Sequence, residues 1–302
     1  MKSGHALAAL ATVAAVCCPA AAQQLFRSGV DVVRVDTLVT DGRRPLAGLK
    51  ARDFEIRDNG KLQAIDSVVV EQVPLSITLV LDTSASVAGG KMTHLAAAAD
   101  AVLTRLRASD RAALVTFSHR VWLRAPLTSR LEQIRAVLAT IQAQGGTSLY
   151  DAVYAGLALS DTRDFRPLVM VFSDGLDNAS WLGGDLVERA AQRADAVVYG
   201  VAVGAREIRE FRDGRLVRVR HEYLPGQTVF LDTIASATGG RVVEAESMDN
   251  LPKAFGVILQ EFRTRYLITY SPRGVDTPGW HTIDVKVKAR RAEVRARRGY
   301  QK

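Results

Sequence analysis

A run of apolar residues that ends in a short polar motif constrains this chain most strongly. Residues 75–81 are almost entirely apolar, and Asp82, Ser84 and Ser86 follow directly within Asp-Thr-Ser-Ala-Ser. Such a run predicts a strand that is buried on both faces, as in a parallel sheet covered by helices. Because open α/β sheets bind ligands at the carboxyl ends of their strands, the three polar residues stand where a binding site is expected.

Two further segments have the same character. A glycine pair precedes Thr147 and opens a helical pattern over residues 148–159, and a second apolar strand, residues 168–172, leads to Asp174. Carboxylates and hydroxyls offer only oxygen, which suits Mg²⁺, Mn²⁺ or Ca²⁺ rather than zinc. With two carboxylates and otherwise neutral hydroxyls, such a site would leave the ion partly positive and open to an outside oxygen.

With these three segments, the chain resembles the von Willebrand factor A domain (VWFA), whose metal-ion-dependent adhesion site (MIDAS) combines D-x-S-x-S with a distant Thr and a distant Asp. The resemblance covers about residues 74–263. It implies a metal site made by Asp82, Ser84, Ser86, Thr147 and Asp174. In the family the two serines contact the ion directly, and Thr147 would do so directly or through water. The aspartates would bind directly or orient waters, and a partner protein's Asp or Glu carboxylate would complete the coordination.

The same central region alternates strands with helices. We expect strands at residues 75–81, 111–117, 121–123, 168–172, 196–203 and 240–244, and helices at 95–106, 129–141, 148–159, 185–194 and 250–263. This order predicts an α/β fold with a doubly wound, mostly parallel, Rossmann-like sheet. Within it, residues 206–228 are rich in arginine around Asp213-Gly214 and predict a hairpin. That hairpin is either a basic arm for a partner or an exposed pair of charged strands.

The segments on either side of this region have β character. Residues 23–73 and 264–302 each show short alternating strands, too few to be stable alone. We expect the two segments to pair into a small β-sandwich from which residues 74–263 project; two independent flanking hairpins are the alternative. The sequences at residues 39–42, 53–60 and 297–300 resemble those of bacterial exported proteins with a VWFA-related domain.

The first 22 residues have the pattern of a secretory signal peptide. Lys2 precedes an apolar stretch at residues 6–16, and Ala20-Ala21-Ala22 supplies a cleavage site. This predicts export to the periplasm or the medium. Both cysteines, Cys17 and Cys18, lie within the leader, so the mature chain would hold no disulfide. No later stretch has the length and apolar character of a transmembrane segment.

Charge and motifs narrow the function. The net charge of +8 over 302 residues comes from arginines dispersed along the chain, which favours a solvated basic surface over nucleic-acid binding. A phosphatase of the haloacid dehalogenase type would need a second Asp where Ser84 stands, and no G-x-S-x-G, H-E-x-x-H, Walker or dinucleotide motif occurs. We therefore expect a metal-dependent protein-interaction module rather than an enzyme. A scaffold whose metal only holds loops together is the alternative, and a metal-dependent hydrolase is the more remote one.

Three other polar residues near the motifs have ordinary explanations. Asp151 lies in the first turn of a predicted helix, where the helix dipole favours a carboxylate. Asp177 is expected to cap a turn. Asn178 begins an Asn-Ala-Ser glycosylation sequence, which we interpret as incidental.

Overall fold

The computed structural model describes residues 32–42, 44–70, 73–160, 164–174, 176–203, 207–212, 215–220, 229–288 and 292–302. For residues 207–212 and 215–220 it describes the backbone alone. The predicted signal peptide, residues 1–22, lies outside the described residues. Residues 31–302 form one compact unit.

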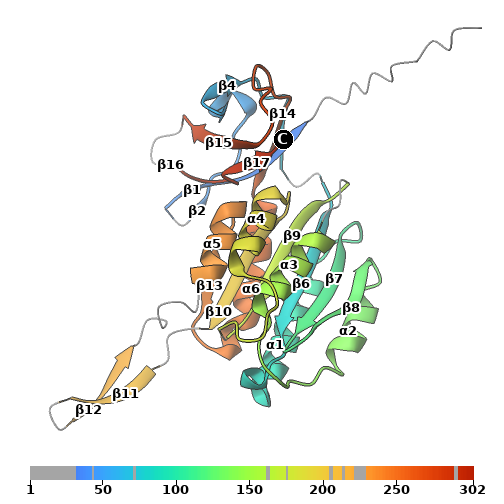
Figure 1. Ribbon diagram of the computed structural model, residues 1–302, viewed down its shortest axis with the longest axis vertical. Helices are drawn as coiled ribbons and strands as arrows, with labels where there is room; N and C mark the ends of the chain where they lie inside the picture. Colours follow the sequence, from blue (N-terminus) through green and yellow to red (C-terminus); the bar gives the residue numbers. More distant parts are fainter. Residues whose placement is uncertain are drawn as a thin grey trace, which may run out of the picture. The chain divides into compact units, whose positions relative to one another are not determined.

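A six-stranded sheet in the order β13-β10-β9-β6-β7-β8 forms the centre of this unit (Figure 1). Neighbouring strands are parallel except β8, which is antiparallel to β7. The predicted mostly parallel α/β fold is therefore confirmed. The strands are β6 (Leu75–Asp82), β7 (Arg111–Phe117), β8 (Val121–Thr128), β9 (Arg166–Phe172), β10 (Val197–Val203) and β13 (Val242–Ala245).

Helices pack on both faces of this sheet because its inner strands bury side chains on both sides. In β6, Leu79 and Leu81 belong to one apolar cluster and Val80 to the other. The first cluster is completed by α1 (Gly90–Leu103), α2 (Leu131–Leu138) and α6 (Leu251–Arg263). The second is completed by α3 (Leu149–Leu159), α4 (Gly184–Arg193) and α5 (Val229–Thr238).

The stretch between β10 and β13 agrees only partly with expectation. Strands β11 (Glu207–Arg212) and β12 (Arg215–Arg220) pair antiparallel, so the predicted hairpin is present. Helix α5 was not expected, although Leu231, Ile234 and Thr238 are buried at helical spacing. Helix α2 is shorter than predicted and ends at Leu138.

Strands from the two ends of the described chain pair with each other. One sheet has the order β16-β1-β14-β5 with β2 beside β1, and the other has the order β17-β15-β3-β4. The alternative of two independent flanking hairpins is therefore wrong. The strands are β1 (Val33–Asp41), β2 (Arg44–Pro45), β3 (Phe54–Asp58), β4 (Lys61–Gln63), β5 (Ser67–Val69), β14 (Tyr266–Tyr270), β15 (Trp280–Val287), β16 (Ala292–Arg295) and β17 (Gly299–Gln301).

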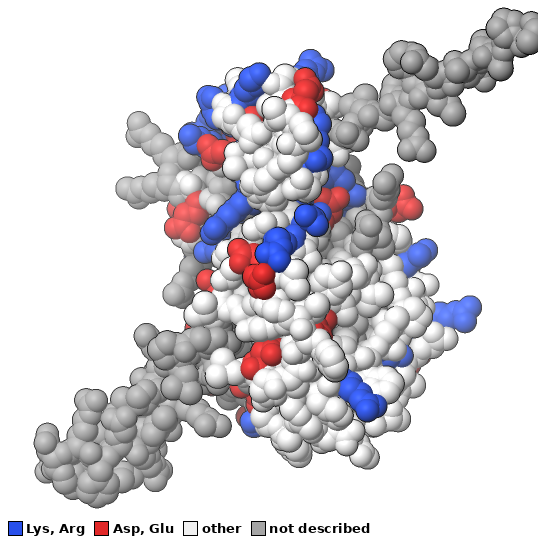
Figure 2. Space-filling model, in the orientation of Figure 1, with Lys and Arg blue, Asp and Glu red and all other residues white. Residues whose placement is uncertain are grey.

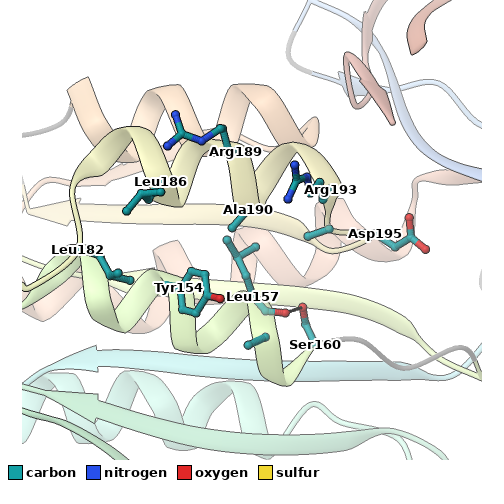
Figure 3. Close-up of a pocket in the computed structure, with 11 residues that line it drawn as sticks. Tyr154, Leu157, Ser160, Leu182, Leu186, Arg189, Ala190, Arg193 and Asp195 are labelled. Carbon is teal, nitrogen blue, oxygen red and sulfur yellow. Dashed lines mark hydrogen bonds between the residues drawn. The ribbon is translucent and has the colours of Figure 1, made fainter. Parts of the chain in front are cut away.

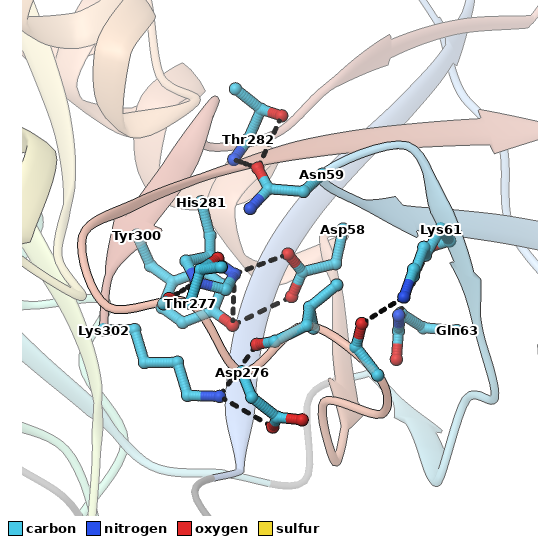
Figure 4. Close-up of polar contacts among 12 residues, drawn as sticks. Asp58, Asn59, Lys61, Gln63, Asp276, Thr277, His281, Thr282, Tyr300 and Lys302 are labelled. Atoms are coloured by element: carbon cyan, nitrogen blue, oxygen red, sulfur yellow. Dashed lines mark hydrogen bonds and ion pairs between the residues drawn. The ribbon is translucent and has the colours of Figure 1, made fainter.

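A buried polar network joins these two sheets. Asp58 at the end of β3 is fully buried, and its Oδ2 accepts a hydrogen bond from the hydroxyl of Tyr300 at 2.8 Å (Figure 4). The same oxygen accepts from the hydroxyl of Tyr270 at 2.9 Å. Its Oδ1 lies 2.8 Å from Nδ1 of His281, whose Nε2 donates to the carbonyl of Thr277 at 2.7 Å. Burial, followed by the Asp58 charge, raises the pKa of Tyr270, so the phenol stays a donor. The network thus satisfies a buried carboxylate with groups from both sheets.

The terminal sheets contact the central sheet at its amino-terminal edge. Asp36 of β1 forms a buried ion pair with Arg166 at the start of β9, and Arg265 donates to the carbonyl of Asp36 at 2.9 Å. Arg297 pairs with Asp195 just before β10. Arg166 begins β9 and Asp195 lies just before β10, so these contacts lie at the edge opposite the one where Asp82 and Asp174 stand.

We expect Asp36→Ala to lower the free energy of unfolding by about 3–5 kcal/mol, because it leaves Arg166 buried without its counter-charge. Asp36 is 8% exposed and Arg166 is 1% exposed, so water would not replace the lost partner. Urea denaturation followed by circular dichroism measures this. Asp284→Ala, which removes an exposed pair with Lys286, is the control and should cost less than about 1 kcal/mol. Equal losses of stability in the two variants would contradict the conclusion that Asp36 and Arg166 form a buried, stabilising ion pair.

Candidate metal centre

Asp82 is the most deeply buried residue of the predicted site. It ends β6 with no exposed surface, and its Oδ1 accepts a hydrogen bond from the backbone N–H of Ser84 at 2.8 Å. Its Oδ2 accepts from the hydroxyl of Ser173 at 2.7 Å. Burial raises the pKa of Asp82, while the hydrogen bonds from Ser173 and Ser84 act in the opposite direction. Asp82 therefore fixes the first turn of the loop that carries the two serines.

From this loop, hydroxyl groups form a row that reaches Asp174. The hydroxyl oxygens of Ser84 and Ser86 lie 2.9 Å apart, and Ser86 donates to Oδ1 of Asp174 at 2.5 Å. Ser84 is buried, whereas Ser86 is exposed. The row thus runs from the interior of the protein to its surface.

Thr147 is brought beside this row through backbone bonds. The carbonyl of Gly145 accepts from the N–H of Ala85 at 3.0 Å, which ties the Thr147 loop to the serine loop. Gly145 has φ of 77° and its position leaves no room for a Cβ against the His119 ring, so glycine is required there. The N–H of Thr147 donates to Oδ1 of Asn178 at 2.8 Å, which ties it to the loop after β9.

The structure therefore brings the predicted site residues from three loops to one edge of the sheet. Direct hydrogen bonds link Asp82, Ser84, Ser86 and Asp174, and Thr147 joins through its loop. The sequence also predicts that Gly175 lets the chain turn sharply after Asp174, and this residue lies outside the described residues.

Sequence reasoning missed several supporting residues. Ser173 directly precedes Asp174, a position that could have signalled its bond to Asp82. Asn178, interpreted as part of an incidental glycosylation sequence, instead positions Thr147. Asp177 accepts from the N–H of Ser180 three residues on, as expected of a residue that caps a turn. Asp151 lies in the first turn of α3 as expected, and its bond from the N–H of Leu182 at 2.9 Å was not foreseen.

The donor chemistry of this cluster fits a hard divalent cation. Its oxygens are two carboxylates and hydroxyls, which suit Mg²⁺ or Ca²⁺. Within the described part of the chain there is no group of three or more His, Cys, Asp or Glu side chains that could hold a metal. The candidate site has only two carboxylates, and its other oxygens are hydroxyls. It is therefore compatible with the absence of such a group.

Comparison with known proteins identifies the domain. Residues 77–176 match the family model of the von Willebrand factor type A domain. These residues carry the sequence of a von Willebrand factor type A domain. No curated protein matches the chain.

Several solved structures are similar to this chain at low sequence identity. The zinc-bound structure of proximal thread matrix protein 1 (PTMP1) from the mussel byssus is 18% identical with a TM-score of 0.52, and the match covers 68% of this chain and 49% of that one. An aerotolerance-related membrane protein from Bacteroides fragilis is 17% identical with a TM-score of 0.48, covering 62% of this chain and 98% of that one. The PilB minor pilin from Streptococcus sanguinis is 14% identical with a TM-score of 0.49, covering 64% and 62%. At these identities the likeness concerns the fold alone.

A lysine at the start of α1 already contacts the predicted site of this A domain. The ammonium group of Lys91 donates to Oδ2 of Asp174 at 3.0 Å and to the carbonyl oxygen of Ser86 at 2.8 Å. It partly neutralises Asp174 and would repel a second positive charge beside it. The ammonium group of Lys91 thus lies against the one candidate ligand that is a partly exposed carboxylate.

We expect Lys91→Met to tighten Mg²⁺ binding by about two- to fivefold, the range that follows from a partly exposed ion pair of up to about 1 kcal/mol. The substitution removes a competitor for Asp174 and keeps the apolar stem of the side chain. Calorimetric titration of chelator-treated protein measures the affinity. Lys253→Met is the control, because Lys253 is an exposed residue of α6. Weaker binding by Lys91→Met would show instead that the ammonium group holds the ligands in place.

Proposed function

We propose that this protein is an exported interaction module that binds a partner protein through a divalent cation. The cation would be held by Asp82, Ser84, Ser86, Thr147 and Asp174. A carboxylate from an Asp or Glu of the partner would complete its coordination. The activity proposed is binding, without catalysis.

The observation that carries this proposal is the row of oxygen donors at the carboxyl edge of the sheet. It is anchored inside by Asp82 and reaches the surface at Ser86, so an ion bound there would be held by the protein and open to solvent on one side. A partly positive ion in an open position attracts an outside carboxylate. The zinc-occupied MIDAS motif of PTMP1 supports metal binding by a fold of this kind.

Mg²⁺ is the cation we propose first, with Mn²⁺ and Ca²⁺ as alternatives. Hydroxyl and carboxylate oxygens are the ligands these ions prefer. Zinc occupies the motif in PTMP1, although sulfur and imidazole ligands usually accompany zinc in proteins. Zinc therefore belongs among the ions to be tested.

Surface charge supports a protein partner rather than nucleic acid. On the face drawn in Figure 2, basic and acidic side chains are interspersed, and much of this face carries no charge. A nucleic-acid site usually gathers its basic residues into one patch or stripe. Around the candidate metal centre, the exposed residues His119 and Arg120 and the half-exposed Lys91 suit an acidic group on the partner.

The proposed location and domain arrangement follow from the ends of the chain. The leader at residues 1–22 would direct export to the periplasm or the medium. Among the described residues no helix is long and apolar enough to cross a membrane. We further propose that residues 23–73 and 264–302 make one small β-sandwich, with the A domain at residues 74–263 inserted between them.

A structural scaffold is the main alternative, and a metal-dependent hydrolase is the more remote one. In a scaffold, the ion would only join the three loops. Its removal would lower the stability of the protein and would not change the binding of any partner protein. Asp82→Ala does not separate the two functions, because Asp82 is buried and satisfies Ser84 and Ser173 in either case. Asp174 lies nearer the surface and is the sharper test.

We expect one Mg²⁺ to bind the chelator-treated protein and Asp174→Ala to weaken that binding by at least about a hundredfold, since it removes one of only two carboxylates. The midpoint of urea denaturation without metal should change little. Calorimetry with Mg²⁺, Mn²⁺, Ca²⁺ and Zn²⁺ measures binding, and Asp249→Ala, which alters an exposed carboxylate, is the control.

Two results would count against the module. Wild-type protein that binds none of these ions would remove the metal site. A protein that binds Mg²⁺, is strongly stabilised by it and binds no acidic peptide would favour the scaffold. Ligand binding at a hundred times its dissociation constant adds about 2.7 kcal/mol to stability, so the stabilising effect is measurable.

A further inference from the structure

An exposed tryptophan lies on the loop that joins β9 to α4, beside the candidate metal centre. Trp181 is 95% exposed, although tryptophan is rarely left in water without a reason. It follows Asn178 by three residues, and Asn178 bonds to the N–H of Thr147. The Cα atoms of Asn178 and Trp181 are therefore within about 11 Å of each other even in a fully extended chain.

This loop is held rigidly by the first turn of α3. Oδ2 of Asp151 accepts from the N–H of Trp181 at 3.0 Å, and Oδ1 accepts from the N–H of Leu182 at 2.9 Å. Asp177 accepts from the N–H of Tyr150 and from the hydroxyl of Ser180. The indole is thus exposed on a fixed backbone, which lowers the entropy lost when a partner covers it.

The residue after Trp181, Leu182, lines a hollow between α3 and α4 in which apolar side chains stand beside Arg189 and Arg193. The hollow has a volume of about 510 Å³, with Leu182 near one end and Ser160 and Asp195 near the other (Figure 3). Tyr154 and Leu186 line it and are each 45% exposed. We call Trp181, Leu182, Leu186 and Tyr154 the apolar ledge.

We propose that the apolar ledge is the specificity surface of the metal site and that it takes apolar side chains of the partner next to its metal-binding carboxylate. The partner is then a protein segment in which an Asp or Glu is followed or preceded by large apolar residues. This inference rests on the proposed function. The metal centre and the basic residues near it would bind the partner's carboxylate. The apolar ledge would bind the apolar side chains next to that carboxylate.

The division of roles has a physical basis. One metal–carboxylate bond cannot distinguish among the many proteins that expose Asp or Glu, so discrimination must come from contacts around it. Tryptophan is among the residues that dominate binding at protein interfaces, particularly when it is rigid and adjoins a pocket. The apolar ledge supplies such an anchor next to a hollow that an apolar side chain can enter.

The test uses a displayed library of random peptides with one fixed central Asp, selected on the purified protein in Mg²⁺ and in chelator. We expect peptides that bind only in Mg²⁺ and carry large apolar residues near the fixed Asp. Trp181→Ala should bind the selected peptide at least about tenfold more weakly, as expected for an interface anchor, while its Mg²⁺ affinity stays at the wild-type value. Trp181→Phe should retain most of the peptide affinity.

Leu62→Ala is the matched control, because Leu62 is 62% exposed on β4 in the terminal sheets. Mg²⁺-dependent peptides without apolar preference, bound equally by Trp181→Ala, would overturn this inference and leave the proposed function standing. Peptides that bind equally in chelator and need Trp181 would also overturn it, because the apolar ledge would then act apart from the metal. An absence of Mg²⁺-dependent peptides for a protein that binds Mg²⁺ would overturn both proposals.

Self-association is the remaining outcome that would contradict the inference. If sedimentation shows a dimer that Trp181→Ala converts to a monomer, the apolar ledge is covered by a second copy of the chain. We expect the wild-type protein and Trp181→Ala to sediment alike.

Discussion

The burial of β6 along its whole length is the constraint on which the rest of the structure depends. All eight of its residues, Leu75 to Asp82, are buried, so neighbouring strands must cover both its edges and helices both its faces. Charged groups can therefore meet this strand only at its ends. At the first end, Asp110 accepts from the N–H of Leu75 and pairs with Arg263. At the other, Asp82 organises the loops of the candidate metal centre.

The same constraint explains what the sequence could predict. A long apolar strand followed by Asp82, and a second followed by Asp174, place two carboxylates at one edge because parallel strands share their carboxyl ends. Helix α5 was not predicted, because β-branched residues such as Val229, Thr233 and Ile234 lower the helix propensity of its sequence. Lys91 also escaped, because its contact with Asp174 joins residues 83 positions apart and depends on where α1 begins.

The terminal strands show a different limit. Their alternating pattern predicted β structure, and the need for more strands predicted that the two segments pair. It did not reveal that Asp36 and Asp58 are buried, since aspartate is ordinarily exposed. Each is buried only because distant residues satisfy it: Arg166 for Asp36, and Tyr270, His281 and Tyr300 for Asp58. These partners are distant from the aspartates in the sequence, so local sequence patterns could not predict them.

The two edges of the central sheet consequently serve different purposes. The amino-terminal edge holds buried charge pairs whose partners are fixed within the chain, which makes it costly to change and unsuited to exchange with outside groups. The carboxyl edge carries the exposed hydroxyl of Ser86, the half-exposed Lys91 at the start of α1 and a tryptophan that is 95% exposed. The loop of Trp181 is held by Asp151, so little order is lost when a partner covers the exposed side chain. The fold therefore concentrates its internal attachments at one edge and leaves the other available for recognition.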